Sequence, residues 1–65
     1  MINNAVIHFY PRSPYIARAA VNIREGERIR GRFILRDVSA ARDFLRRAYP
    51  AIPSKVIVHT GGGDK

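Results

Sequence analysis

Arginine recurs along one short segment of the chain in a pattern that could bind anions. The segment RIRGRFILR, residues 28–36, carries Arg28, Arg30, Arg32 and Arg36, with apolar residues or glycine between them. A period of two is the period of a β-strand, so such a strand has one apolar face and one cationic face. Guanidinium groups bind phosphate through a planar fork of donors and stack on nucleobases. Like charges on one strand face repel each other, so the pattern indicates a polyanion as partner.

The composition of the whole chain favours the same partner. Among 65 residues, 12 Lys and Arg stand against 5 Asp and Glu, which gives a net charge of +7 and a sequence pI near 11.2. Only Lys55 and Lys65 are lysines. An arginine-biased codon usage would explain that ratio, but it would not explain the net charge or its placement. We expect nucleic acid, bound with a strong dependence on salt through counterion release.

Residues that could carry out a reaction are scarce. The chain has no cysteine, its histidines are His8 and His59, and its 5 acidic residues are scattered. These offer neither a set of metal ligands nor a nucleophile with its base. The glycines of TGGGDK follow a strand-like segment, but no helix follows them as a phosphate loop requires. We therefore expect no enzyme, no cofactor and no metal site.

The start of the chain and its hydropathy bear on the compartment. MINNAVIHFYP lacks a basic leader, and no segment approaches the roughly 18–20 apolar residues that a membrane span needs. The absence of cysteine fits a reducing compartment. We expect a cytoplasmic protein with no membrane partner.

The elements that would position these side chains begin with AVIHFY at residues 5–10, which is typical of a strand. The prolines that follow favour a turn at residues 11–14. If Ile7 and Phe9 of the strand point into the core, His8 and Tyr10 lie beside the arginines on the other face. There the two rings could stack on bases.

Residues 15–24, YIARAAVNIR, fit either a strand or a helix. As a helix, Ser13 would cap it and Gly26 would end it. As a strand, it would form a hairpin with residues 28–36 through the loop of residues 24–26, with Gly26 in the left-handed conformation. The hairpin register would set Val21 opposite Ile29, Ala19 opposite Gly31, Ala17 opposite Phe33 and Tyr15 opposite Leu35. We favour the strand, because this pairing gathers apolar residues on one face and arginines on the other.

The period changes to that of a helix in SAARDFLRRAY, residues 39–49, with Ser39 as its N-cap. On the exposed side Asp43 can pair with an arginine three or four positions later. KVIVHT, residues 55–60, is rich in β-branched residues and predicts a last strand.

The expected fold class is therefore α+β, a small antiparallel sheet in the order β-β-β-α-β with one helix packed on its apolar face. If the ambiguous segment is helical, the order becomes β-α-β-α-β. Residues 1–60 are expected to form a single compact domain with Phe33, Phe44 and Tyr15 in its core. Residues 61–65 are expected to form a flexible C-terminal tail.

The cationic face of this sheet is the predicted nucleic-acid-binding site. Its members are Arg18, Asn22, Arg24, Arg28, Arg30, Arg32 and Arg36. Secondary contacts are predicted for Arg42 and Arg46 of the helix and for His8 and Tyr10 of the first strand. Because Ile34 interrupts the arginine run, the charge concentrates toward the turn, and we expect the arginines at that end to matter more than Arg36.

Three stretches carry a resemblance to known domains, namely AAVNIR (19–24), RIRGRF (28–33) and AARDFLRRAY (40–49). Through them, residues 19–49 resemble the DNA-binding domains of plant AP2 factors and the arm-binding domains of phage integrases, in which a helix packs on a three-stranded sheet. In the AP2 family, arginines of the sheet contact the major groove. The resemblance implies that role for Arg24, Arg28 and Arg30.

Two functions fit these features. The first is a small basic nucleic-acid-binding protein, with DNA favoured over RNA, whose arginine-rich hairpin contacts phosphates and guanine edges in a groove. The second is a small adaptor or inhibitor of the kind that phages or plasmids encode, which docks on an acidic protein surface. The edge strands of so small a sheet also favour self-pairing, so we expect a homodimer.

Overall fold

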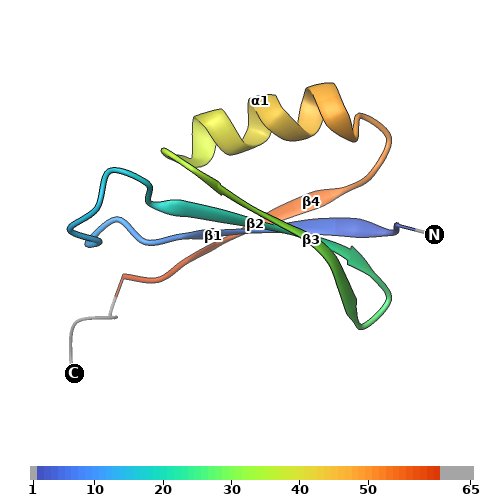
Figure 1. Cartoon of the computed structure of the whole chain (residues 1–65), viewed down its shortest axis with the longest axis horizontal. Coiled ribbons are helices and arrows are strands. Elements are labelled where there is room, and N and C mark those ends of the chain that lie inside the picture. Colours follow the sequence, from blue (N-terminus) through green and yellow to red (C-terminus); the bar gives the residue numbers. More distant parts are fainter. Residues whose placement is uncertain (1, 61–65) are drawn as a thin grey trace.

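The computed structural model describes residues 2–60, which form one sheet with one helix above it (Figure 1). In chain order the elements are β1 (Asn4–Phe9), β2 (Ala19–Glu25), β3 (Arg28–Leu35), α1 (Val38–Ala48) and β4 (Ser54–Val58). The strands form a four-stranded sheet in the order β3-β2-β1-β4. The predicted α+β class and the order β-β-β-α-β are confirmed, and the alternative order with two helices is wrong. The tail predicted at residues 61–65 lies outside the described residues.

One strand pair differs from the antiparallel sheet that was predicted. β1–β2 and β2–β3 are antiparallel, but β4 pairs parallel to β1, so the sheet is mixed. The helix accounts for this, because α1 carries the chain from the end of β3 at one sheet edge back to the start of β4 at the other (Figure 1). A helical crossover of this kind leaves the strands that it connects parallel.

The hydrophobic core lies between the sheet and α1. Ile7 of β1 and both Val21 and Ile23 of β2 are 0% exposed. They pack with Ala41 and Leu45 on the inner side of the helix. One face of the sheet is thereby used for folding, and the opposite face is left for other tasks.

The predicted core aromatics are confirmed at two positions and wrong at the third. Phe33 and Phe44 pack against the core, with ring centroids 4.7 Å apart. Tyr15 is 73% exposed in the loop between β1 and β2. β2 begins only at Ala19, because residues 11–14 hold two prolines that cannot donate to a strand ladder and the chain bends until residue 17. Residues 15–18 therefore lie outside the strand that was predicted for residues 15–24.

The β2–β3 hairpin has a shorter loop and a different register from the prediction. The loop holds Gly26 and Glu27 alone, and Gly26 has the predicted left-handed conformation with φ 63°. Val21 lies opposite Phe33 and not opposite Ile29. Because the register is displaced by an even number of residues, the apolar faces of the two strands still coincide.

A β-bulge near the hairpin tip exchanges the faces of β3. Ile23 lies opposite Gly31, but the next residue, Arg24, lies opposite Ile29, so that Arg30 falls between paired positions. The extra residue of a bulge interrupts the alternation of faces along its strand. Ile29 therefore shares a face with Arg24, and Arg28 lies on the other face, so the face predicted for Arg28 was wrong. Arg30 is the extra residue and falls outside the predicted alternation.

Asp37, rather than the predicted Ser39, caps the helix. The Oδ1 atom of Asp37 accepts a hydrogen bond from the backbone N–H of Ala40 at 2.9 Å. A carboxylate at this position also offsets the positive end of the helix dipole, whereas a serine hydroxyl carries no charge. The N-cap and the first residue of the helix therefore lie two residues earlier than predicted.

Candidate nucleic-acid interface

We call the side of the sheet away from α1 the open face. It carries the residues that alternate with the core residues, because successive side chains of a strand point to opposite sides. Within residues 2–60 no helix or further strand covers it (Figure 1). Its residues are Val6, His8 and Tyr10 from β1 and its extension, Ala20, Asn22 and Arg24 from β2, Ile29, Arg32 and Ile34 from β3, and Lys55, Ile57 and His59 from β4 and its extension.

Three rings lie together at one end of the open face. The ring of Tyr10 stacks on that of His59, with centroids 4.4 Å apart and planes 13° apart. Nδ1 of His8 and Nε2 of His59 are joined by a hydrogen bond of 3.0 Å. The backbone holds this arrangement, because the N–H of His59 donates to the carbonyl oxygen of Phe9 at 2.8 Å. We call Tyr10, His59 and His8 the ring cluster.

The surroundings of His8 disfavour its protonation. Burial lowers the pKa of His8, and positive charge on His59 and on Arg32 lowers it further. The hydrogen bond between the imidazoles needs one protonated and one bare nitrogen, which two neutral rings provide and two imidazolium ions do not. An anion beside the cluster would act in the opposite sense, because it stabilises the protonated ring.

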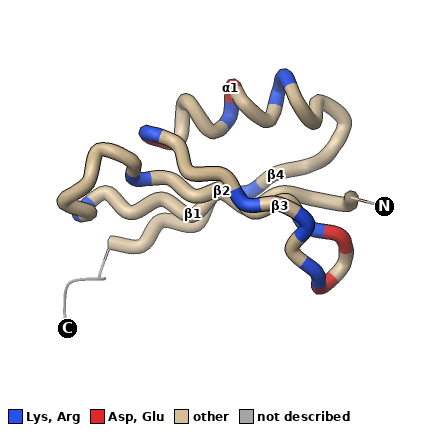
Figure 2. The backbone as a smooth tube through the Cα atoms, viewed as in Figure 1, with Lys and Arg blue, Asp and Glu red and all other residues tan. Residues whose placement is uncertain are grey.

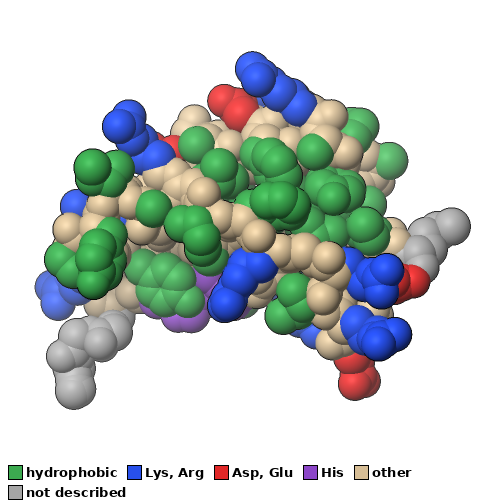
Figure 3. All heavy atoms as spheres, viewed as in Figure 1, with side chains coloured by type: hydrophobic (Ala, Val, Ile, Leu, Met, Phe, Trp, Pro, Cys, Tyr) green, Lys and Arg blue, Asp and Glu red, His purple; other side chains and the backbone are tan. Residues whose placement is uncertain are grey.

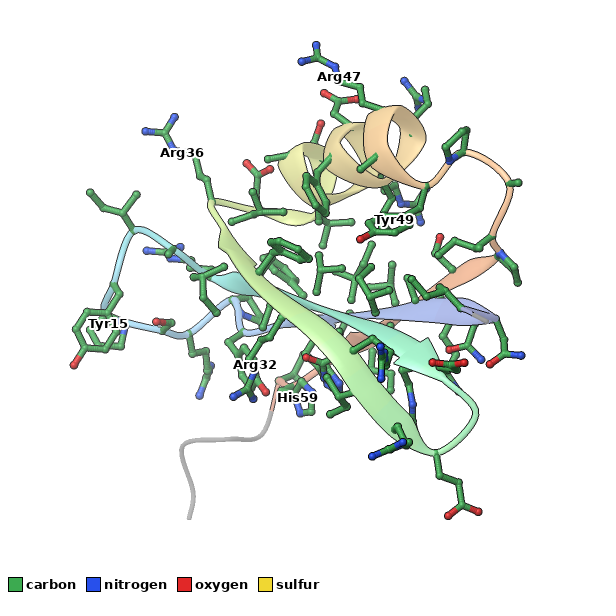
Figure 4. The ribbon with its side chains drawn as sticks, turned by 45° about the vertical axis from the view of Figure 1, so that its right-hand side comes forward. Tyr15, Arg32, Arg36, Arg47, Tyr49 and His59 are labelled. Atoms are coloured by element: carbon green, nitrogen blue, oxygen red, sulfur yellow. The ribbon has the colours of Figure 1, made fainter. Side chains whose placement is uncertain are left out.

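Arg32 is the arginine of β3 that adjoins the ring cluster. It lies opposite Asn22 in the ladder, and its charge acts on His8. Figure 4 shows its side chain on the side of the sheet away from the helix. In the space-filling view the histidine side chains lie between hydrophobic and basic side chains at the lower surface of the molecule (Figure 3). Rings beside a guanidinium group are the combination on which nucleic-acid bases and phosphates are held.

A pocket of about 260 Å³ opens at the other end of the open face. It is lined by side chains that include Asn4 and Val6 of β1, Arg24 of β2 and Lys55 of β4. Asn4 lies opposite Arg24, and Val6 lies beside Lys55. The two strands that flank β1 therefore bring one cation each to the same pocket.

Three buried polar atoms lie on this part of the face without a hydrogen-bond partner within residues 2–60. They are Oδ1 of Asn4, Oδ1 of Asn22 and Nε of Arg24. Asn22 as a whole is only 8% exposed. A buried polar group without a partner costs about 1–3 kcal/mol.

The hairpin tip is less cationic than the arginine pattern indicated. Figure 2 shows acidic residues among the basic ones there, and they are Glu25 and Glu27. Nε of Arg30 lies 3.3 Å from a carboxylate oxygen of Glu25. Arg28 is exposed and lies opposite Glu25, hence on the other side of the hairpin from Arg24. The charge available for a ligand of the open face is therefore not concentrated at the tip.

Arg18 and Arg36 meet at the opposite end of the hairpin, where the N–H of Arg18 donates to the carbonyl oxygen of Arg36 at 3.1 Å. The guanidinium of Arg18 also donates from Nε to the carbonyl oxygen of Tyr15 at 3.1 Å, which ties it to the β1–β2 loop. Arg36 points away from the sheet beside the start of α1 (Figure 4). From the predicted site the structure brings together Asn22, Arg24 and Arg32, with His8 and Tyr10 from the secondary set. The backbone of Arg18 also lies opposite Tyr10, whose N–H donates to the carbonyl oxygen of Arg18 at 2.8 Å.

The helix arginines lie on the far side of the molecule from the open face. Arg42 and Arg46 are exposed on α1, which packs on the other side of the sheet (Figure 2). Arg46 makes the predicted ion pair with Asp43, at 3.4 Å. One ligand on the open face would not reach them, so the predicted secondary contacts of Arg42 and Arg46 would need a second binding surface.

The sequence reasoning missed Lys55 and His59 as members of the site. The alternation in KVIVH places both on one face of a strand, together with Ile57. Which face that is depends on the parallel register, in which His8 lies beside Ile57. An antiparallel sheet was predicted, so this register was not considered, and neither Lys55 nor His59 was among the predicted site residues.

Comparison with known proteins finds no matching family model, no matching curated protein and no matching solved structure. In the described part of the chain, no helix is long and apolar enough to cross a membrane. Among residues 2–60, no group of three histidine or acidic side chains could hold a metal ion. The residues of the open face are therefore the basis for the proposed function.

Proposed function

We propose that this protein binds nucleic acid through the open face of its sheet. The observation that carries the proposal is the stack of Tyr10 on His59, at 4.4 Å between centroids, on the same face as Arg32, whose charge acts on His8. No helix or further strand of residues 2–60 covers this face. These groups lie outside the hydrophobic core, so folding does not require them to lie close to one another. Stacking rings and cations on one surface suit a ligand with bases and phosphates.

Different side chains of the open face contact different parts of the nucleic acid. Arg32, Arg24 and Lys55 engage phosphate oxygens through charge-assisted hydrogen bonds, and the rings offer a face to a base. DNA remains the favoured nucleic acid, because the resemblance of residues 19–49 to AP2 domains favours it. We place the protein in the cytoplasm.

The test is a titration with fluorescently labelled DNA and RNA, each single-stranded and double-stranded, at about 50 mM and about 200 mM salt. Neutralising a few phosphates predicts that the affinity falls by at least tenfold between the two salt concentrations. Absence of binding to all four ligands at the lower salt concentration would rule out the proposal. An affinity that does not change with salt would rule out phosphate contacts by these cations.

A second candidate is favoured by two exposed side chains on the same face. Ile29 and Ile34 are 56% and 61% exposed, on either side of Arg32 along β3. Apolar side chains around an arginine are typical of the centre of a protein–protein interface. The alternative function is an adaptor or inhibitor of the phage or plasmid kind that docks on an acidic partner protein. Recovery of one stoichiometric protein after nuclease treatment, together with no nucleic-acid affinity, would favour it.

The edges of the sheet support a homodimer as part of this proposal. β3 and β4 are the edge strands, and Val58 of β4 is 51% exposed. An edge strand of apolar residues is a template for pairing with a second chain. Sedimentation at micromolar protein concentration tests this, and a single monomeric species would contradict it.

A further inference from the structure

We propose that the nucleic acid bound by the open face is a single strand, with one unpaired base stacked on Tyr10 and its phosphate backbone running along β1 to the pocket at Arg24 and Lys55. This inference rests on the proposed function and names its ligand more narrowly. It also differs from the sequence-based expectation, in which the hairpin enters a groove of a duplex.

The ring cluster is built to extend a stack. Tyr10 covers one face of His59 with its plane tilted by only 13°, and 41% of Tyr10 is exposed. The hydrogen bond of 3.0 Å between His8 and His59 fixes the orientation of the imidazole beneath. A base added to this column gains stacking with an immobilised platform, so little ring freedom is lost on binding.

A duplex cannot use such a platform. Its bases are already stacked on each other, and they present only their edges in the grooves. A ring that stacks on a base needs an unpaired base, and an open four-stranded sheet with rings on its surface is a known way to bind one.

The hairpin tip does not supply the groove-binding alternative. A two-stranded ribbon that enters a groove needs cations free at its tip. Here the tip loop contains Glu27, and Arg30 is 3.3 Å from Glu25. Glu27 and the pairing of Glu25 with Arg30 reduce the positive charge that the tip offers to the phosphates of a duplex.

The pocket end of the face offers complementary groups for the rest of the strand. The guanidinium group of Arg24 and the ammonium group of Lys55, which line the pocket from the two sides of β1, can donate to phosphate oxygens. The phosphates of a nucleotide strand are acceptors for both groups.

The two ends of the face are joined by a single strand of the sheet. His8 and Asn4 both point to the open face from β1, four residues apart, and at about 3.3 Å per residue this separation is about 13 Å. Val6 lies between them on β1 and is only 6% exposed, so its side chain does not project far from the open face. A short oligonucleotide therefore spans the ring cluster and the pocket together.

The experiment measures fluorescence anisotropy of the wild-type chain with a labelled DNA single strand, the same strand in a duplex, and the same strand with abasic positions. We expect the intact single strand to bind about tenfold more tightly than the other two ligands. The abasic strand keeps every phosphate and leaves the protein unchanged, so a loss with it isolates stacking.

The matched variants are Tyr10→Ala, Tyr10→Phe and Tyr15→Ala. We expect Tyr10→Ala to weaken single-strand binding by about tenfold or more, Tyr10→Phe to stay within about twofold of wild type, and Tyr15→Ala to have no effect. If Tyr10→Ala fails to fold, the comparison of intact and abasic strands with wild-type protein still decides the matter.

The outcomes separate this inference from the proposed function. Duplex and single strand bound equally well, or intact and abasic strands bound equally well, would overturn the inference and leave nucleic-acid binding in place. No binding to any of the three ligands at about 50 mM salt would overturn both.

Discussion

The ring of Tyr10 lies parallel to the imidazole of His59, with 4.4 Å between their centroids and 13° between their planes. Neither residue belongs to a strand, because β1 ends at Phe9 and β4 at Val58. The parallel pair β1–β4 nevertheless continues far enough to bring the two rings together, since the N–H of His59 donates to Phe9. A contact between two distant segments of the chain thus builds a flat aromatic surface outside the hydrophobic core.

The protonation of His8 makes the stability of the free protein depend on pH. Its pKa is below the ordinary value of 6.5 because of burial, His59 and Arg32. Between pH 6.5 and the lowered pKa the unfolded chain binds more protons than the folded chain, so the free energy of unfolding falls as the pH falls through this window. Urea denaturation at about pH 7.5 and about pH 5.5 measures the change. Replacing the group by His8→Gln should flatten the profile, and a stability that rises on acidification would contradict the assignment.

Ligand binding should respond to pH in the opposite direction. A phosphate beside the ring cluster stabilises the imidazolium form and raises the pKa of His8 again. Binding then takes up protons, so the affinity for a DNA strand increases as the pH falls from about 7.5 to about 5.5 at constant salt. Anisotropy titrations at the two values test this, and His8→Gln is the control that should reduce the increase. An affinity independent of pH would place the phosphates away from the histidines.

The core assignment predicts a sharp contrast between two chemically identical substitutions. Ile7 is 0% exposed and Ile16 is 75% exposed. Ile7→Val should reduce the free energy of unfolding by about 0.5–1.5 kcal/mol, because the removed methylene leaves a cavity. Ile16→Val should leave it within about 0.5 kcal/mol, as is usual at the surface. Urea denaturation of both variants measures the two losses of free energy of unfolding. Equal losses would contradict the packing of β1 against the helix.

The helix cap gives a test that distinguishes the observed start of α1 from the start that its apolar period indicated. Asp37→Ala removes the acceptor for the Ala40 N–H and should cost about 0.5–2 kcal/mol. Ser39→Ala should cost much less, because Ser39 lies inside the helix. Thermal unfolding followed by circular dichroism measures both, and a larger loss for Ser39→Ala would support the cap expected from the sequence.

The sequence was most informative where a period repeats over a whole element. The alternation in residues 28–36 and the helical spacing in residues 39–49 predicted one strand and one helix correctly, and the order of the elements followed. The parallel pairing of β4 could not be found this way, because a strand period does not reveal its partner. It depends on the direction in which α1 returns the chain, and His59 and Lys55 were missed with it.

The candidate site was predicted only in part, for a similar reason. Asn22, Arg24 and Arg32 share the open face as alternation requires. Arg28 lies on the other face, because a bulge with Arg30 as its extra residue interrupts β3 beside Arg24. The bulge depends on how the hairpin closes. The two-residue loop of Gly26 and Glu27 gives one register at the tip, the rest of the ladder has another, and the extra residue joins the two. The arginine pattern contains no signal for that extra residue.

The measurement that tests the central claim most directly compares Arg32→Gln with Arg47→Gln. Both substitutions remove one positive charge, but Arg32 lies beside the ring cluster and Arg47 points away from the sheet on α1 (Figure 4). If the open face binds nucleic acid, Arg32→Gln should weaken DNA binding by about tenfold at low salt and reduce the salt slope by about one. Arg47→Gln should stay within about twofold of wild type. Equal weakening by the two variants would contradict the claim, because it would mean that net charge rather than the open face holds the ligand.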